Sequence, residues 1–259
     1  MLAKTAIKQA FAGAANHYDS VADLQRRAGI ALLKQLPASG LGGNLLDLGC
    51  GTGFLTGELL TKAPTSPIIA IDIALPMLQT ARQKLLAATN IRYVCADAEQ
   101  LPLASHSIDT ICSNLALQWC YPLDKVLQEL RRVLKPGGWL LFSTFGNQSL
   151  QELAAAWREV DHYRHINDFY DLPSLQQQLQ QAGFVDSQFQ QTLQQSHYPQ
   201  VLDLLRELKQ LGAGHVIQGR NPQLTSKARL QAMQAAYENH RTAQGIPATF
   251  DIINILTRT

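Results

Sequence analysis

The stretch that decides the fold is Leu45-Leu46-Asp47-Leu48-Gly49-Cys50-Gly51-Thr52-Gly53-Phe54. A short apolar run, typical of a buried strand, ends in three closely spaced glycines, and a helical pattern follows them. Glycines let the backbone turn tightly and let a ligand approach where a Cβ atom would obstruct it. We therefore expect a ligand-binding loop between a strand and a helix.

The spacing of the glycines narrows the kind of ligand. The pattern is G-x-G-x-G, whereas the dinucleotide fingerprint G-x-G-x-x-G would place its last glycine at Phe54. Asp47 agrees, because a carboxylate at the end of this strand would repel a phosphate and attract an ammonium or sulfonium group. The loop disfavours a dinucleotide-dependent dehydrogenase and favours a cofactor without a pyrophosphate.

Outward from the loop, apolar runs of strand length alternate with helical patterns. The predicted strands cover residues 44–48, 67–73, 91–96, 107–113 and 139–145. The helices predicted between them cover residues 54–62, 75–88 and 123–134. Such an alternation predicts an α/β fold, with a parallel, doubly wound (Rossmann-like) sheet and helices on both faces.

Helical spacing also precedes this alternation, over residues 4–36, with a break at Tyr18-Asp19-Ser20. After residue 147 the predicted elements are helices at 150–160, 172–181, 200–211 and 225–241 and strands at 184–198 and 249–256. We therefore expect a seven-stranded, mostly parallel sheet in a single domain over residues 1–259. Its predicted parts are a helical cap (1–40), a cofactor-binding core (41–146), and lid helices with the C-terminal strands (147–259).

Composition excludes several classes of protein. With 46% hydrophobic and 16% charged residues the chain can bury a sizeable core, and a net charge of +2 is too mild to indicate nucleic-acid binding. No apolar run approaches the roughly 18 residues of a membrane span, and no secretory signal is evident, so a cytoplasmic protein is expected. Of four cysteines, none has zinc-ligand spacing, so no metal is predicted, and Cys95 and Cys112 are expected to be reduced and buried.

Polar residues follow the ends of the other strands, where a parallel sheet binds its ligands. Asp72 ends the second strand about 20 residues after the first and can accept hydrogen bonds from both hydroxyls of a ribose. Asp97 follows the third strand and can accept a bond from an adenine amino group, while the backbone N–H of Ala98 can bond a ring nitrogen. The fourth strand ends in residues 112–119, and its polar tip is expected to face the reacting groups.

Together, the glycine loop and these strand ends resemble the class I S-adenosylmethionine-dependent methyltransferase family over residues 40–145. The resemblance implies that Asp47, Gly49 and Gly51 line the methionine part of S-adenosylmethionine. It also implies that the amino-terminal helices close over the cofactor. The cofactor-binding residues expected on this basis are Tyr18, Asp47, Gly49, Cys50, Gly51, Asp72, Ile73, Met77, Asp97, Ala98 and Asn114.

Three further stretches, at residues 11–26, 143–169 and 208–225, extend the resemblance to nearly the full length. In this combination and order they resemble the malonyl-acyl-carrier-protein O-methyltransferase family of biotin synthesis. Gly214 departs from it, standing where a polar residue is expected. The resemblance implies methyl transfer to the free carboxylate of a malonyl thioester, carried by acyl carrier protein or coenzyme A.

A carboxylate is ionised near pH 7, so no general base is needed and no catalytic residue is assigned. Transfer then depends on alignment of the reactants and exclusion of water. A cation should hold the acceptor carboxylate, and the candidates are Arg164, Arg206, Lys209 and Arg220. The predicted acceptor-binding residues are Gln118, Trp119, Lys209 and Arg220; the last two flank the matching Gly212-Ala213 segment.

Acyl carrier protein is acidic, so a basic face is expected on this chain. Its candidate residues are Lys4, Lys8, Arg26, Arg27 and Arg206. Two alternatives stay open beside the dehydrogenase. One is a methyltransferase of the same fold that acts on another small acid or on a quinone precursor, and the other is a cofactor-binding module without catalysis. The sequence leaves the oligomeric state open.

Overall fold

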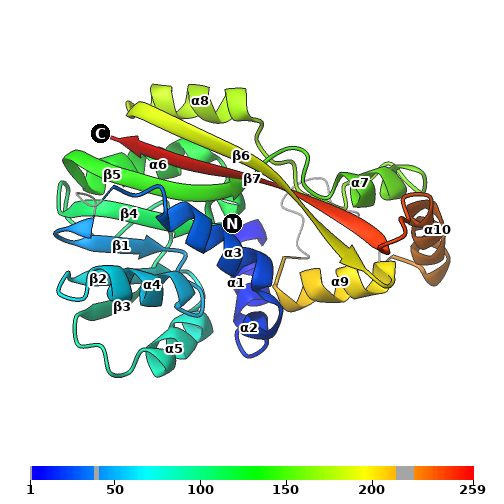
Figure 1. Cartoon of the computed structure of the whole chain (residues 1–259), viewed down its shortest axis with the longest axis horizontal. Coiled ribbons are helices and arrows are strands. Elements are labelled where there is room, and N and C mark those ends of the chain that lie inside the picture. Colours follow the sequence, from blue (N-terminus) through cyan, green and yellow to red (C-terminus); the bar gives the residue numbers. More distant parts are fainter. Residues whose placement is uncertain (1, 38–40, 214–224) are drawn as a thin grey trace.

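The computed structural model describes residues 2–37, 41–213 and 225–259. A seven-stranded sheet runs through the molecule in the order β3-β2-β1-β4-β5-β7-β6 (Figure 1). The strands are β1 (Leu45–Leu48), β2 (Ile68–Asp72), β3 (Ile91–Cys95), β4 (Ile108–Asn114), β5 (Leu134–Phe145), β6 (Val185–Tyr198) and β7 (Ile246–Arg258). The predicted α/β sheet is therefore confirmed.

The first five strands pair in parallel, so their carboxyl ends meet at one edge of the sheet. β7 enters antiparallel between β5 and β6, which makes the sheet mixed but mostly parallel. The strand order reverses at β1, since β2 lies on one side of it and β4 on the other. Such a reversal opens a crevice beyond the carboxyl ends of the strands, where open α/β sheets bind their ligands.

Helices cover both faces of the sheet and its carboxyl edge (Figure 1). They are α1 (Leu2–Ala14), α2 (Tyr18–Val21), α3 (Asp23–Leu33), α4 (Phe54–Lys62), α5 (Leu75–Lys84), α6 (Leu123–Val133), α7 (Gln151–Arg158), α8 (Leu172–Gln181), α9 (Val201–Gln210) and α10 (Lys227–Glu238). Several boundaries differ from the expectation: β5 and β7 are longer than predicted, and α5 and α10 are shorter. The first helix breaks at residues 15–17, and Tyr18 begins a new helical turn. β5 begins directly after α6 at Leu134, because Leu134 pairs with Ile108 despite the glycines that follow.

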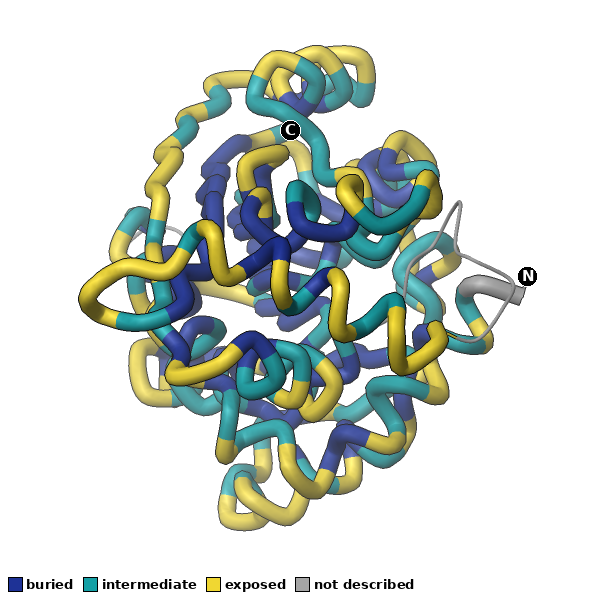
Figure 2. Tube along the Cα trace, turned by 90° about the vertical axis from the view of Figure 1, so that its right-hand side faces the viewer, coloured by how far each residue is buried: buried dark blue, intermediate teal, exposed yellow. Residues whose placement is uncertain are grey.

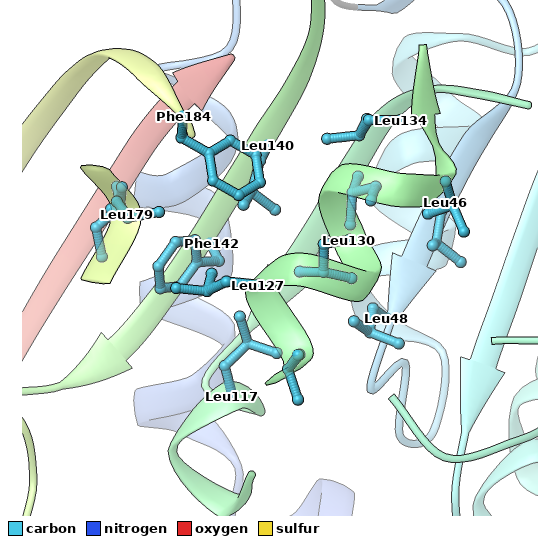
Figure 3. Packing of buried hydrophobic residues seen from close by; sticks show 14 of the residues in the cluster. Leu46, Leu48, Leu117, Leu127, Leu130, Leu134, Leu140, Phe142, Leu179 and Phe184 are labelled. Atoms are coloured by element: carbon cyan, nitrogen blue, oxygen red, sulfur yellow. The ribbon is translucent and has the colours of Figure 1, made fainter. Parts of the chain in front are cut away.

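Leucines of α6 fill the space between that helix and the sheet. Figure 3 shows Leu127 and Leu130 facing Leu140 and Phe142 of β5, with Phe184 beside them. Their spacing of three residues places both leucines on one face of the helix, as the amphipathic pattern requires. A second cluster on the opposite face joins α3 and α4 to β1 and β4. The sheet is thus buried on both sides, and Figure 2 shows its interior positions buried beneath exposed outer turns.

The long strands β6 and β7 extend past the main sheet and carry a separate group of helices (Figure 1). There α7, α9 and α10 pack on the strand ends around Trp157, Leu204, Met233, Tyr237 and Phe250. This cluster also includes residues of α3, so the amino-terminal helices share a core with the part of the chain after residue 147.

The prediction for the cysteines is half right. Cys112 lies fully buried in the middle of the sheet, whereas Cys95 is exposed at the end of β3. β3 is the outermost strand on its side, so its residues have a neighbouring strand on one side alone. Over the part of the chain that the structure describes, no helix is long and apolar enough to cross a membrane. Within the same residues, no group of histidine, cysteine and acidic side chains could hold a metal ion.

Candidate active site

A cavity of about 850 Å³ lies at the carboxyl ends of the parallel strands, beneath the amino-terminal helices. Its walls come from α1, from the glycine loop, and from the segments that follow β2, β3 and β4. The predicted residues that it brings together are Tyr18, Gly49, Gly51, Asp72, Ile73, Met77, Asp97, Ala98, Asn114 and Trp119. A volume of this size and a largely apolar wall with a few polar groups suit a cofactor-sized molecule.

The glycine loop is held against the end of β2. The backbone N–H groups of Gly49 and Cys50 both donate to the carbonyl of Ile71, at 2.8 and 2.9 Å. Gly49 has a φ of +71°, and a Cβ there would come within 2.4 Å of the Ala116 side chain. Gly51 has a φ of +53°, and a Cβ there would meet nothing within 4 Å. The first glycine is therefore required by packing, and the second keeps the backbone open toward the cavity.

Asp72 joins the end of β2 to the glycine loop. Its carboxylate accepts hydrogen bonds from the backbone N–H of Gly51 at 2.9 Å and from that of Ala74 at 2.8 Å. The side chain is 8% exposed, and burial raises its pKa above the usual value. Each carboxylate oxygen can accept more than one bond, so Asp72 can also accept from a ligand in the cavity whose wall it forms.

Asp47 is the most deeply buried carboxylate near the loop, at 1% exposure. One oxygen, Oδ2, accepts a bond from Thr56 Oγ1 at 2.5 Å, while Oδ1 has no hydrogen-bond partner. Burial raises the pKa of this carboxyl to about 7. Asp47 and Cys50 line a smaller adjoining cavity of about 430 Å³ that shares Gly49 and Gly51 with the first. A buried, unpartnered oxygen is costly, and a cationic ligand group would satisfy it.

Lys4 lines the cavity at the end where Asp97 and Glu99 lie. From the sequence, Lys4 was instead expected on a basic face that binds acyl carrier protein. Its ammonium donates to Asp97 Oδ2 at 2.7 Å and lies 2.6 Å from Glu99 Oε2. These contacts tie α1 to the segment after β3, across more than 90 residues of sequence. No local pattern signals such a pairing, because it arises only when α1 folds over the sheet.

The turn between α1 and α3 closes the cavity from above. Asp19 accepts a bond from Thr52 of the glycine loop at 2.6 Å and pairs with Lys84 of α5. Tyr18 lies beside Asp72, and burial together with the nearby carboxylates raises the pKa of its hydroxyl strongly. Phe11 of α1 meets Trp119 edge to face, with the ring centroids 5.4 Å apart. Phe11 was not predicted as a site residue, although it lies in a stretch that carried the resemblance.

Asn114 acts as a link between β4, β5 and α3. Its Oδ1 accepts a bond from Ser143 Oγ, and its Nδ2 donates to the backbone carbonyl of Gln25, both at 2.8 Å. Gly29 allows this approach, since a Cβ there would lie 3.2 Å from Asn114 Nδ2.

Burial raises the pKa of the nearby Cys50 thiol well above its usual value, so this thiol is not an activated nucleophile.

The chain matches the family described as "Methyltransferase domain" over residues 46–142. The malonyl-acyl carrier protein O-methyltransferase of Methylococcus capsulatus is 42% identical to it over 248 residues, which are 95% of this chain and 90% of that protein. The chain belongs to the malonyl-acyl-carrier-protein O-methyltransferase family. This membership confirms the predicted family and S-adenosylmethionine as its cofactor.

Other relatives of this family member are longer. The biotin biosynthesis bifunctional protein BioHC of Cellvibrio japonicus is 45% identical over 249 residues, which are 96% of this chain and 49% of that protein. The chain thus spans about half the length of the bifunctional relatives it matches. Among solved structures, the YcgJ protein from Bacillus subtilis has a TM-score of 0.60 at 17% identity, covering 94% of this chain and 99% of that one. This likeness confirms the predicted fold.

The predicted acceptor residues of this methyltransferase family member are scattered. Gln118 lines a second cavity beside the first; its Nε2 donates to the Leu115 carbonyl at 2.6 Å, and its buried Oε1 has no hydrogen-bond partner. Lys209 is exposed in the last turn of α9 and lines neither the first cavity, its smaller neighbour nor the second cavity. Arg220, like Gly214, lies outside the described residues. The acceptor roles of Lys209 and Arg220 stay predictions.

Proposed function

We propose that this chain transfers the methyl group of S-adenosylmethionine to the free carboxylate of a malonyl thioester carried by acyl carrier protein. The observation that carries the proposal is the full-length similarity to the Methylococcus capsulatus protein, which bears that activity in its name. Coenzyme A is the alternative carrier. The proposed organisation is one domain, with residues 1–40 as the cap, 41–146 as the cofactor-binding core and 147–259 as the lid and the last strands.

The residues of the first cavity and of its smaller neighbour fit this cofactor. Asp72 would accept bonds from the two ribose hydroxyls, and Asp97 with the Ala98 backbone would hold the adenine. The unpartnered Oδ1 of Asp47 suits the ammonium of the methionine part. The remaining wall residues proposed for cofactor binding are Tyr18, Gly49, Cys50, Gly51, Ile73, Met77 and Asn114. When bound, the cofactor supplies a methyl group activated by a positively charged sulfur.

The chain itself contributes alignment, exclusion of water and charge rather than proton transfer. Among the described residues that line the first and second cavities, none is a histidine. None is needed, because the acceptor carboxylate is already ionised near pH 7. Phe11 and Trp119 close the roof of the cavity and keep water away from the reacting atoms.

The two buried carboxylates decide from which side the acceptor enters. Asp47 and Asp72 lie on the side of the glycine loop, where they would repel a second anion. We therefore expect an anionic acceptor to approach from the side of β4 and β5. Gln118 and Trp119 lie there, and they are proposed to line its path.

The test is an acceptor screen with the purified chain and S-adenosylmethionine labelled in its methyl group. The substrates compared are malonyl-acyl carrier protein, malonyl-coenzyme A, succinyl-coenzyme A and free malonate. We expect labelled methyl ester on the malonyl thioesters, with the carrier protein preferred. Binding of the cofactor without transfer to any malonyl thioester would overturn the proposal.

A further inference from the structure

Beyond the cofactor cavity, a second cavity opens at the ends of β4 and β5. We call this space of about 740 Å³ the acceptor cavity; its walls include Gln118, Cys120, Phe145, Arg164 and Phe169. It shares Cys120 with the cofactor cavity. On its other side it shares Arg164 and Phe169 with an open groove along the residues that follow β5. The acceptor cavity therefore adjoins both of the other spaces.

Among the described residues, the positive charge in the acceptor cavity comes from one basic side chain. Within the described part of the chain, Arg164 is the one lysine, arginine or histidine in its walls. Its guanidinium donates through Nη1 to the carboxylate of Asp168, four residues later. The two side chains are 51% and 69% exposed. Exposed ion pairs of this kind contribute little stability, so another carboxylate can replace Asp168 at small cost.

The walls around Arg164 are suited to a small acyl group. Phe145 and Phe169 meet edge to face, with centroids 5.5 Å apart, and Tyr170 lines the same cavity. An acyl group bound between these rings would displace water and strengthen a charge-assisted bond formed there. An arginine can hold both oxygens of a carboxylate through two parallel N–H bonds.

We propose that Arg164 leaves Asp168 and binds the free carboxylate of the acceptor, holding it in the cavity next to the cofactor. This assignment rests on the proposed function, because it requires an acceptor that carries a carboxylate. It differs from the expectation for Lys209, which is exposed in α9. It also differs from Arg206, which pairs with Asp203 on α9 and lines none of these three spaces.

The test compares Arg164→Gln and Arg164→Lys with a matched control, Arg241→Gln. Arg241 is also a partly exposed arginine, paired with Glu238 three residues earlier in sequence; it follows the end of α10 and also donates to the Pro199 carbonyl. Three quantities are measured on the whole chain: cofactor affinity by calorimetry, kcat/KM with malonyl-acyl carrier protein and with malonyl-coenzyme A, and the affinity for the methyl-ester product.

In Arg164→Gln we expect kcat/KM to fall by about 30-fold or more with both carriers, the scale for removing one partner of a bonded charge pair. Cofactor affinity and affinity for the uncharged ester should stay within about twofold, because neither involves the carboxylate contact. Arg164→Lys should recover part of the loss, since it keeps the charge but not the paired bonds. Arg241→Gln should match the wild type.

A second variant separates a binding role from a structural one. Asp168→Asn removes the competing carboxylate, so KM for the malonyl thioester should fall while Tm stays near that of the wild type. Unchanged kcat/KM in Arg164→Gln would overturn the proposal, as would a loss of affinity for the methyl ester as large as the loss in kcat/KM. A wild-type chain that binds the cofactor but methylates no malonyl thioester would instead show that the proposed function itself is wrong.

Discussion

Asp47 makes cofactor binding depend on pH in a way that can be worked out from the structure. Its carboxyl has a pKa of about 7 in the unliganded protein, because burial disfavours the charged form. A cationic cofactor needs the ionised form, so binding requires loss of this proton. Below pH 7 the ionised fraction falls about tenfold per pH unit, and the dissociation constant for S-adenosylmethionine should rise by the same factor. Between pH 7.5 and pH 5 the expected loss is roughly 50–100-fold.

The stability of the unliganded chain should show the opposite trend. The pKa of Asp47 is higher in the folded state than its unfolded value of about 3.9. The folded state therefore binds the extra proton, and this contribution to stability is complete below about pH 4 and lost as pH rises toward 7. Asp72, whose pKa is also raised by burial, acts in the same direction. The cofactor should restore at neutral pH the stability that ionisation removes.

Isothermal titration calorimetry from pH 5 to pH 7.5, in buffers of different ionisation enthalpy, measures both the affinity and the number of protons released. Asp47→Asn is the matched control, since it preserves the shape of the side chain and cannot ionise. Its affinity should lie near the low-pH limit of the wild type, with a flatter pH dependence. A wild-type affinity that stays constant across this range, without proton release, would refute the reasoning.

Three further predictions concern other contacts of the cofactor cavity. Asp72→Ala should weaken cofactor binding by roughly 1–3 kcal/mol and also lower Tm, because two loop amides lose their acceptor; calorimetry showing unchanged affinity would exclude the ribose role. Gly49→Ala should destabilise the chain by about 1–3 kcal/mol more than Gly51→Ala in urea unfolding, because only the first Cβ collides with Ala116; equal effects would contradict this packing argument. Lys4→Met should change the free energy of unfolding by less than about 1 kcal/mol, because the ion pairs it removes are partly exposed. It should tighten cofactor binding severalfold, because Asp97 is released to bind the adenine; weaker binding would show that Lys4 assists the cofactor instead.

The cofactor side of the molecule could be predicted from sequence because its signals are local. The glycine loop lies directly between β1 and α4, and α4 spans the same residues in the prediction and in the structure, Phe54–Lys62. Asp72 is the last residue of β2 and Asp97 lies two residues after the end of β3, so finding the strands was enough to place the carboxylates at one edge.

Contacts between distant segments could not be predicted in this way. Lys4 pairs with Asp97 only because α1 crosses the carboxyl edge of the sheet, a choice that no local pattern encodes. Cys95 was expected to be buried, because an apolar run does not show whether its strand will be central or outermost. The early start of β5 was missed for a related reason: pairing with β4 holds Leu134 in the sheet although glycines follow.

The acceptor side could not be predicted from sequence, because it depends both on contacts between distant segments and on which side chains the fold leaves exposed. Its cavity is formed by residues after β4, by the end of β5 and by the loop over residues 164–170, which approach one another only in the folded chain. The sequence shows four plausible cations, and the fold leaves Arg164 in that cavity while Lys209 faces outward. If the acceptor carries a carboxylate, as proposed, the buried carboxylates of the cofactor side would repel it, and it would depend on the cation in the acceptor cavity. Discrimination between a malonyl thioester and its methyl ester should therefore reside in Arg164 rather than in the glycine loop, and the two sites can be altered separately.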